Sequence, residues 1–145
     1  MNFYAKHFDE LTTRELYEIL KARSEIFLLE QGIVCQDLDR VDYDSIHCFL
    51  ESNGEIAAYL RAYTDAEGVK IGRVLTLTHG VGFGRLLMEK SIPVVARQFN
   101  TDRIILHAQT QARGFYEKLG YTVASAEFLE EGVPHVTMKI KLEKA

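Results

Sequence analysis

The segment TLTHGVGFGRLLM, residues 76–88, constrains the fold more than any other part of the chain. The β-branched residues at its start favour a strand, and the apolar residues at its end favour a helix. Between them, glycine occupies every second position from Gly80 to Gly84, so the turn carries few side chains. Glycine permits positive φ angles and lets another molecule approach the backbone closely. The segment therefore predicts a strand that passes through a bare turn directly into a helix.

Helix signals occur at three places. Thr12 and Glu15 form a capping box that begins an amphipathic helix, which should end near Gly32. A second helix should begin in the glycine turn, and Pro93 should kink or shorten it because the proline ring clashes with the preceding turn. A third, short helix is expected over residues 110–120, where the last glycine takes the C′ position.

Strand signals fill most of the remaining chain. The dipeptide Asn53-Gly54 between two apolar runs is a strong hairpin signal. Strands are expected over residues 2–8, 47–52, 55–63, 69–77, 103–109, 121–128 and 135–142. Early hairpins followed by β-α-β crossovers favour an α/β (α+β) fold with a mixed central sheet of about six to seven strands and helices on both faces. We expect one domain over residues 1–145.

Charge and hydropathy exclude several classes of function. The formal net charge of −4 argues against general nucleic-acid binding, which needs a basic surface. The longest apolar runs are much shorter than the ~20 residues that cross a bilayer, so no membrane association is expected. The first residues, MNFYAKHFDE, lack the pattern of a signal peptide. The spacing of Cys35 and Cys48 matches no zinc site. We therefore expect a cytoplasmic protein without a metal.

The glycine turn is a candidate anion site. N–H groups at a helix N-terminus lack partners and carry partial positive charge, so the turn HGVGFG could hold a pyrophosphate. The alternative is a glycine-rich turn that binds nothing. A P-loop is excluded because Arg85 and Leu86 stand where Lys-Ser/Thr would be required. The spacing GxGxG also differs from the dinucleotide fingerprint GxGxxG.

Two motifs together carry a resemblance to a known family. The window from His79 to Gly84 resembles the acetyl-CoA-binding segment of the GNAT N-acetyltransferases, with His79 where Arg or Gln is usual. Residues 109–121, QTQARGFYEKLGY, resemble a second segment of that family, with Gln109 in place of the common Asn. The positions that match are Ala112, Phe115, Tyr116, Gly120 and Tyr121. The order of strands and helices is also that of the family, so the resemblance covers nearly the whole chain.

Three further stretches are similar to the ElaA-like branch of the GNAT enzymes. They are RSEIFLLEQGIVCQDLDRVDYDSIH (23–47), LHAQ (106–109) and FLEEGVPHVTMKI (128–140). The branch supplies no settled substrate. The resemblance therefore implies a GNAT fold and an acetyl-CoA-dependent N-acetyltransferase, but it leaves the amine acceptor open: a small amine, a polyamine, an antibiotic or a protein amine.

The resemblance also assigns cofactor-binding positions. The backbone of the glycine turn should hold the pyrophosphate of coenzyme A, and the preceding strand should run beside the pantetheine arm. An N–H group near Val74 would donate to the oxyanion. The implied positions are Val74, Leu75, Thr76, His79, Gly80, Val81, Gly82, Phe83, Gly84, Arg85 and Gln109.

In this family the amine attacks the thioester directly, which requires proton transfers at two places. The match of Tyr116 implies an acid that protonates the leaving thiolate, although an aromatic at this position could also serve only as core. Glu30, His47 and His135 are candidates for the general base, and each could instead be a structural residue. A chain of water molecules could also replace a single base.

Other questions stay open at the level of sequence. The rival function is an acyl-CoA-binding sensor or interaction module without turnover. The acidic loop QDLDRVDYD could recognise a cationic amine or could be a solvated surface loop. It carries Asp37, Asp39, Asp42 and Asp44. Homodimers are common in the GNAT family, so the resemblance allows a homodimer. The expected partner is a small-molecule or peptide amine.

Overall fold

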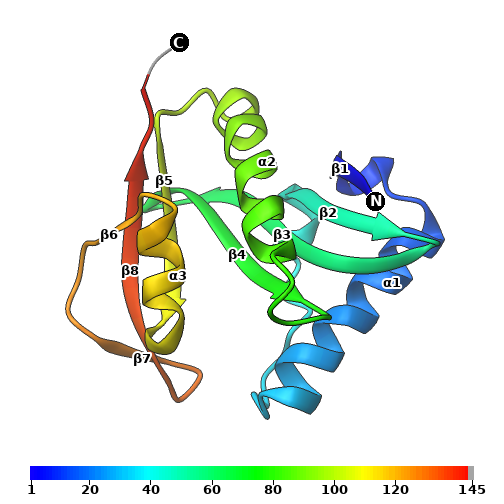
Figure 1. The fold of residues 1–145 in the computed structure, drawn as a ribbon, viewed down its shortest axis with the longest axis horizontal. Helices are drawn as coiled ribbons and strands as arrows, with labels where there is room; N and C mark the ends of the chain where they lie inside the picture. Colours follow the sequence, from blue (N-terminus) through cyan, green and yellow to red (C-terminus); the bar gives the residue numbers. More distant parts are fainter. Residues whose placement is uncertain (144–145) are drawn as a thin grey trace.

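A computed structural model describes residues 1–143, which form one eight-stranded sheet with helices against it (Figure 1). The strand order is β1-β2-β3-β4-β5-β8-β6, with β7 paired to β8. The only parallel pair among these strands is β4 with β5. The strands are β1 Asn2–His7, β2 Ile46–Ser52, β3 Glu55–Asp65, β4 Gly68–Thr76, β5 Arg103–Gln109, β6 Thr122–Val123, β7 Phe128–Glu130 and β8 Val133–Lys141. The mixed α/β fold is confirmed, with eight strands instead of six to seven.

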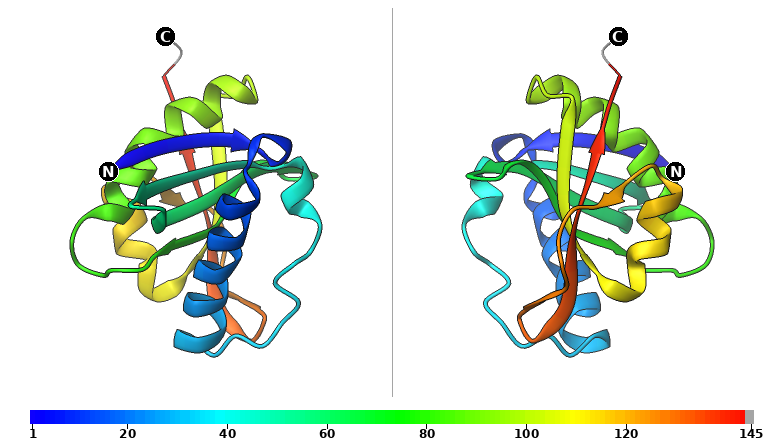
Figure 2. Two further views of the ribbon diagram at one scale, coloured as in Figure 1. Left: turned by 90° about the vertical axis from the view of Figure 1, so that its right-hand side faces the viewer. Right: turned by 90° about the vertical axis from the view of Figure 1, so that its left-hand side faces the viewer.

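Helices cover both faces of the sheet, as expected (Figure 2). Helix α1, Thr13–Arg23, continues as a π-helical segment over Ser24–Glu30. It packs with Phe49 and Tyr59 on one face. Helix α2, Phe83–Gln98, and helix α3, Arg113–Lys118, contribute to the core of the opposite face.

The alternation of side chains along each strand produces these two cores. On the α2 face, β2 and β3 contribute Cys48 and Leu60, which pack with Leu87 and Val95 of the helix. Each of these four residues is fully buried. Both faces of the central strands are therefore covered. The facing sides of β4 and β5, which pair at only two positions, are the part of the sheet that is left for a site.

Several local predictions are confirmed. Thr12 and Glu15 exchange both hydrogen bonds of a capping box at the start of α1. Asn53 and Gly54 adopt φ values of 55° and 81°, as a two-residue hairpin turn requires. Gly120 has a φ of 100° and ends α3, so it occupies the predicted C′ position.

Two local expectations differ from the structure. Pro93 does not shorten α2, which continues to Gln98, because this proline lies on the exposed face and the carbonyl group it leaves unbonded can be hydrated. Residues 121–128 do not form one strand. They contribute β6 and the first residue of β7, and the intervening segment instead hydrogen-bonds β8 through Ala124 and Ser125. No helix within residues 1–143 has the length and apolar character needed to cross a membrane.

Candidate active site

A bulge in β4 creates the space for a site. Tyr59 pairs with Leu75 and Arg61 pairs with Gly72, so β4 carries one more residue than β3 in this interval. Arg73 lies in the bulge with a φ of 51°. A bulge bends its strand and increases the local twist. On its other side, β4 pairs with β5 only at Lys70 and Ile71, and past that point the two strands separate.

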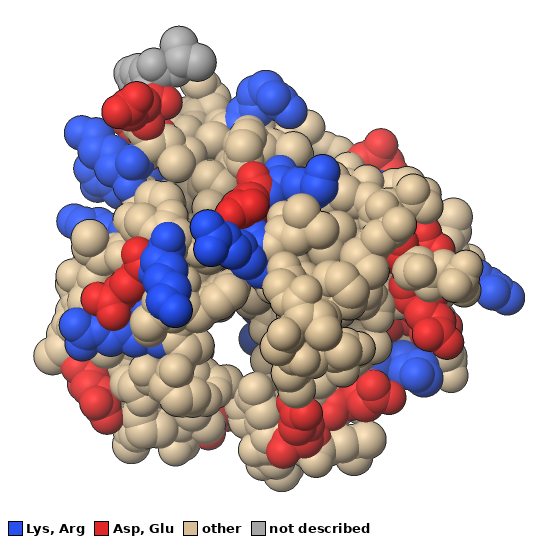
Figure 3. All heavy atoms as spheres, in the orientation of Figure 1, with Lys and Arg blue, Asp and Glu red and all other residues tan. Residues whose placement is uncertain are grey.

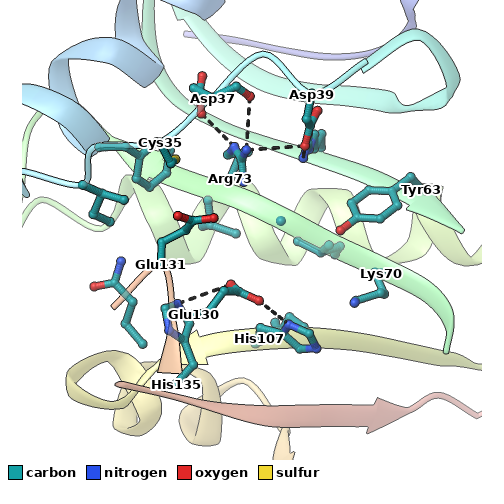
Figure 4. Close-up of a pocket in the computed structure, with 18 of the residues that line it drawn as sticks. Cys35, Asp37, Asp39, Tyr63, Lys70, Arg73, His107, Glu130, Glu131 and His135 are labelled. Carbon is teal, nitrogen blue, oxygen red and sulfur yellow. Dashed lines mark hydrogen bonds and ion pairs between the residues drawn. The ribbon is translucent and has the colours of Figure 1, made fainter. Parts of the chain in front are cut away.

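Two cavities lie on the two sides of this separation. The first, of about 430 Å³, is called here the β4–β5 cavity. It is lined mainly by polar side chains from β3, β4, β5, the loop before β2 and the β7–β8 hairpin, ten of which are labelled in Figure 4. The second, of about 540 Å³, is the glycine-turn cavity, between β4, the start of α2, and α3. The surface is visibly hollowed between the β8–α3 side and the β4 side (Figure 3).

Val74 and Tyr116 line both cavities. The Tyr116 side chain is buried, and its ring makes edge contacts with Phe115 and Tyr121, with centroids 5.1 and 5.9 Å apart. Burial raises the pKa of the Tyr116 phenol well above its ordinary value, so the group stays protonated near neutral pH. A neutral phenol can donate a proton or a hydrogen bond to a group that enters from either cavity.

The glycine turn leaves the start of α2 open to a ligand. Gly80 and Gly82 have φ values of 77° and 84°, and no atom lies within 4 Å of the position a Cβ would take on either. Gly82 is the N-cap of α2, which has no side-chain cap and no acidic residue in its first turn. Helix α1, by contrast, is capped by Thr12 and Glu15. The first N–H groups of α2 are thus free of side-chain acceptors and suit an anion.

The charged residues around the turn are paired with each other. His79 Nε2 lies 2.9 Å from Glu30 Oε1, and its Nδ1 lies 3.2 Å from Thr76 Oγ1. Arg85 donates from Nε to Glu89 at 2.8 Å on the exposed side of α2. Glu30, a predicted base, therefore contacts the glycine turn and lines neither cavity.

The other two base candidates are separated by the fold. His47 is 1% exposed; its Nδ1 lies 2.7 Å from the Tyr59 hydroxyl and its Nε2 lies 2.9 Å from the Asp42 carbonyl oxygen. Burial lowers the pKa of His47, and the charges of Arg23 and Arg61 lower it further against the opposing Asp42 contacts. His47 lines neither cavity, so its geometry is that of a core residue.

His135 lies in the wall of the β4–β5 cavity. Its Nδ1 donates to the Val133 carbonyl oxygen at 2.7 Å, so Nε2 carries no proton in the neutral ring; once protonated, Nε2 can form an ion pair with Glu130 Oε2, 3.6 Å away. Glu130 also accepts a hydrogen bond from His107 Nδ1 at 2.8 Å (Figure 4). Among the three base candidates, only His135 is in position to take a proton inside a cavity. Gln109 lines the same cavity and donates to Gln31 at 2.9 Å.

The acidic loop is largely exposed, but three of its four aspartates are paired with arginines. Three of its carboxylates bind three arginines, which come from α1, β3 and β4: Asp37, Asp39 and Asp42 with Arg23, Arg61 and Arg73. Burial raises the pKa of Asp39, but the hydrogen bonds from Arg61 and the charges of Arg61 and Arg73 outweigh it and lower that pKa to about 2. Within residues 1–143, no group of three or more His, Cys, Asp or Glu side chains is arranged to hold a metal ion.

Comparison with known proteins identifies the family. The acetyltransferase (GNAT) domain family matches residues 36–142, which is well over half of the chain. The chain belongs to the GNAT acetyltransferase family. Similar proteins include ElaA of Escherichia coli, 32% identical over 139 residues that cover 91% of each chain. The protein C11D3.02c of Schizosaccharomyces pombe is 31% identical over 147 residues that cover 98% of each chain.

Solved structures agree with the sequence match. An acyl-CoA N-acyltransferase from Pseudomonas aeruginosa superposes with a TM-score of 0.89 at 30% identity, over 97% of this chain and 99% of that chain. The structure of E. coli ElaA gives a TM-score of 0.90 at 29% identity, over 97% and 100%. The resemblance to the GNAT family and its ElaA-like branch is confirmed.

Several cavity residues were missed at the level of sequence. Figure 4 places Arg73, His107 and Glu131 around the β4–β5 cavity, and the sequence assigned a site role to none of the three, although His107 and Glu131 lie within the stretches similar to the ElaA-like branch. The only signal for Arg73 was the neighbouring Gly72, since a glycine inside a strand often marks a bulge. The resemblance of their stretches gave no role to His107 or Glu131, because their place in the cavity depends on which strands become neighbours.

Proposed function

We propose that this protein transfers the acetyl group of acetyl-CoA to a primary amine by direct attack in a ternary complex. The observation that carries the proposal is the meeting of two cavities at Val74 and Tyr116. One cavity contains the open N-terminus of α2, which suits a pyrophosphate. The other is polar and can admit an acceptor. A thioester held from the first cavity would meet an amine held in the second.

The residues of the chain fit coenzyme A on two counts. The uncapped first turn of α2 offers N–H donors, and the open space at Gly80 and Gly82 lets a phosphate approach them. The bulge leaves part of the backbone of Arg73 and Val74 outside the β3–β4 ladder, available to a pantetheine arm or an oxyanion. Acetyl-CoA supplies the activated acetyl group when it is bound.

We assign residues to cofactor binding, to stabilisation of the oxyanion and to the two proton transfers. The amides of residues 81–84 hold the pyrophosphate, and the backbone of residues 74–76 aligns the pantetheine arm. The N–H group of Val74 donates to the oxyanion. His135 Nε2 accepts a proton from the attacking amine, and Tyr116 protonates the leaving thiolate. Glu30 and His47 are left out of this assignment because neither lines a cavity.

The test is calorimetric titration of acetyl-CoA into the wild type and a Gly82→Trp variant. The large side chain would fill the open space in the turn and should abolish binding. Gly54→Trp is the matched control, because Gly54 has a φ of 81° against 84° and lines neither cavity. Circular dichroism checks that both variants are folded.

The outcomes separate the two functions that the sequence leaves open. Binding that Gly82→Trp alone abolishes, together with release of coenzyme A when a panel of primary amines is added, supports the transferase. Binding without release for any amine in the panel favours the acyl-CoA sensor. Absence of acetyl-CoA binding by the wild type contradicts both.

A further inference from the structure

Arg73 adopts a backbone conformation that its side chain disfavours. Its φ of 51° lies in the left-handed region, where a residue with a Cβ is under strain and glycine is not. The chain has a glycine at the neighbouring position 72, where φ is not positive. An arginine in the strained position therefore needs an explanation from its side chain.

The side chain of Arg73 reaches across the β4–β5 cavity wall to the loop that follows α1. Its Nε donates to Asp37 Oδ1 at 2.8 Å, and its Nη2 donates to the Asp37 carbonyl oxygen at 3.1 Å (Figure 4). A weaker contact of 3.5 Å joins Nη2 to Asp39. The two main partners are 36 residues apart in the chain. Charge-assisted bonds of this two-point kind fix direction as well as distance.

Asp37 is anchored on its other side by a buried arginine. Arg23, at the end of α1 and 0% exposed, donates from Nε to Asp37 Oδ2 and from Nη2 to the Asp37 carbonyl oxygen, each at 3.0 Å. Asp37 thus holds α1 through Arg23 and the bulge of β4 through Arg73. Because Arg23 holds the loop against α1, Asp37 is a fixed point to which Arg73 can attach the bulge.

We propose that Arg73 is a positioning residue, which ties the bulge of β4 to Asp37 and so fixes the backbone of Val74 between the two cavities. The bulged backbone has lost part of its ladder with β3, and β5 has already separated from β4 at this level. The Arg73 side chain replaces the missing strand contacts. Its effect on acetyl transfer rests on the proposed function, whereas its effect on the bulge does not.

The first test is amide hydrogen exchange of residues 72–75 in an Arg73→Gly variant. Glycine relieves the backbone strain and removes the side-chain tie, and the backbone freedom that glycine itself adds is measured by the Arg40→Gly control. We expect exchange about fivefold faster, as for loss of one or two tertiary hydrogen bonds. Unchanged exchange would overturn the proposal. Equal acceleration in β1 would also overturn it, since that would indicate global destabilisation.

Arg40→Gly is the matched control. Arg40 is another arginine with positive φ, at 69°, and it is exposed. Its side chain makes no hydrogen bond or ion pair within residues 1–143. This change relieves strain and adds glycine flexibility without the loss of a tie, so exchange of the residues beside position 40 should accelerate less than exchange of residues 72–75 does in Arg73→Gly. Acceleration equal to that of Arg73→Gly would count against the tie.

The second test is kinetic and uses acetyl-CoA with the best amine of the panel. Arg73→Gly should lower kcat about tenfold and change the KM for acetyl-CoA by less than about twofold, because the loss is one of alignment. Arg73→Lys keeps the charge but not the two-point geometry, so its exchange rate and its kcat should both lie between those of Arg73→Gly and the wild type. If Arg73→Gly does not fold, Arg73→Lys takes its place in both tests. A wild-type kcat in either variant would overturn the alignment role. If the wild type binds no acetyl-CoA, the proposed function fails, and the exchange test still shows whether the contact of Arg73 with Asp37 holds the bulge of β4.

Discussion

Val74 of β4 and Tyr116 of α3 are 42 positions apart in the chain and line the same two cavities. One belongs to a bulged strand and the other to a short helix at the end of a separate β-α unit. Residues from the bulge of β4 and from α3 therefore meet where the two cavities join. In the proposed direct transfer, the N–H group of Val74 would stabilise the oxyanion and the phenol of Tyr116 would protonate the leaving thiolate.

Tyr116→Phe should lower kcat about 10²-fold, the usual contribution of a positioned acid, with little change in the KM for acetyl-CoA. No hydrogen bond of the Tyr116 hydroxyl within residues 1–143 would be lost, so thermal stability should change little. The measurement is steady-state release of coenzyme A. Tyr121→Phe is the control, because the Tyr121 hydroxyl is also buried, has no hydrogen-bond partner in the described residues and lines neither cavity. Equal loss in both variants would remove Tyr116 from the role of acid.

His135→Gln should also lower kcat about 10²-fold near neutral pH. The loss should shrink as pH rises, because the free amine then reaches the site already deprotonated. A pH profile of kcat and kcat/KM for both proteins checks this. If His135→Gln has the wild-type profile, a water chain or another group carries the proton.

Glu30→Gln should leave kcat near the wild-type value and tighten acetyl-CoA binding up to about fivefold, the usual limit for an exposed ionic interaction. The reason is that Glu30 contacts His79 at the glycine turn, where its negative charge opposes a phosphate. Titration of acetyl-CoA into both proteins measures the change. A fall in kcat of two orders of magnitude with unchanged binding would restore Glu30 as the base.

His47→Gln should change the pH dependence of stability and leave kcat unchanged. The pKa of His47 is lowered in the folded state, so below its ordinary value near 6.5 the unfolded chain binds the extra proton. The stability that the neutral imidazole contributes is therefore present above that value and is lost as pH falls toward the folded pKa. From pH 7 to 5 the wild type should lose stability more steeply than the variant, by at most about 1.4 kcal/mol per pH unit. Urea unfolding at pH 7, 6 and 5 measures the difference, and parallel curves would contradict the prediction.

Local signals in the sequence determined much of this protein. The capping box of Thr12 and Glu15, the Asn53-Gly54 turn and the glycine turn each act over a few residues, so each could be read without knowledge of the fold. The two GNAT motifs placed Tyr116 and the glycine turn in the expected family. The prediction of one strand over residues 121–128 was wrong, because pairing with β8 determines where β6 ends and where β7 begins.

The tertiary structure alone decided how the candidate residues are distributed. Glu30, His47 and His135 were equal candidates by residue type, and the fold placed the first at a turn, the second in the core and the third in a cavity. The aspartates of the acidic loop likewise form ion pairs with arginines from three different elements, α1, β3 and β4. Strand register and the bulge at Arg73 govern these long-range contacts, and a shift of one residue would turn the affected side chains to the other face of the sheet. The sequence by itself determined the local elements and the family, whereas the packing of distant segments determined which side chains share a cavity.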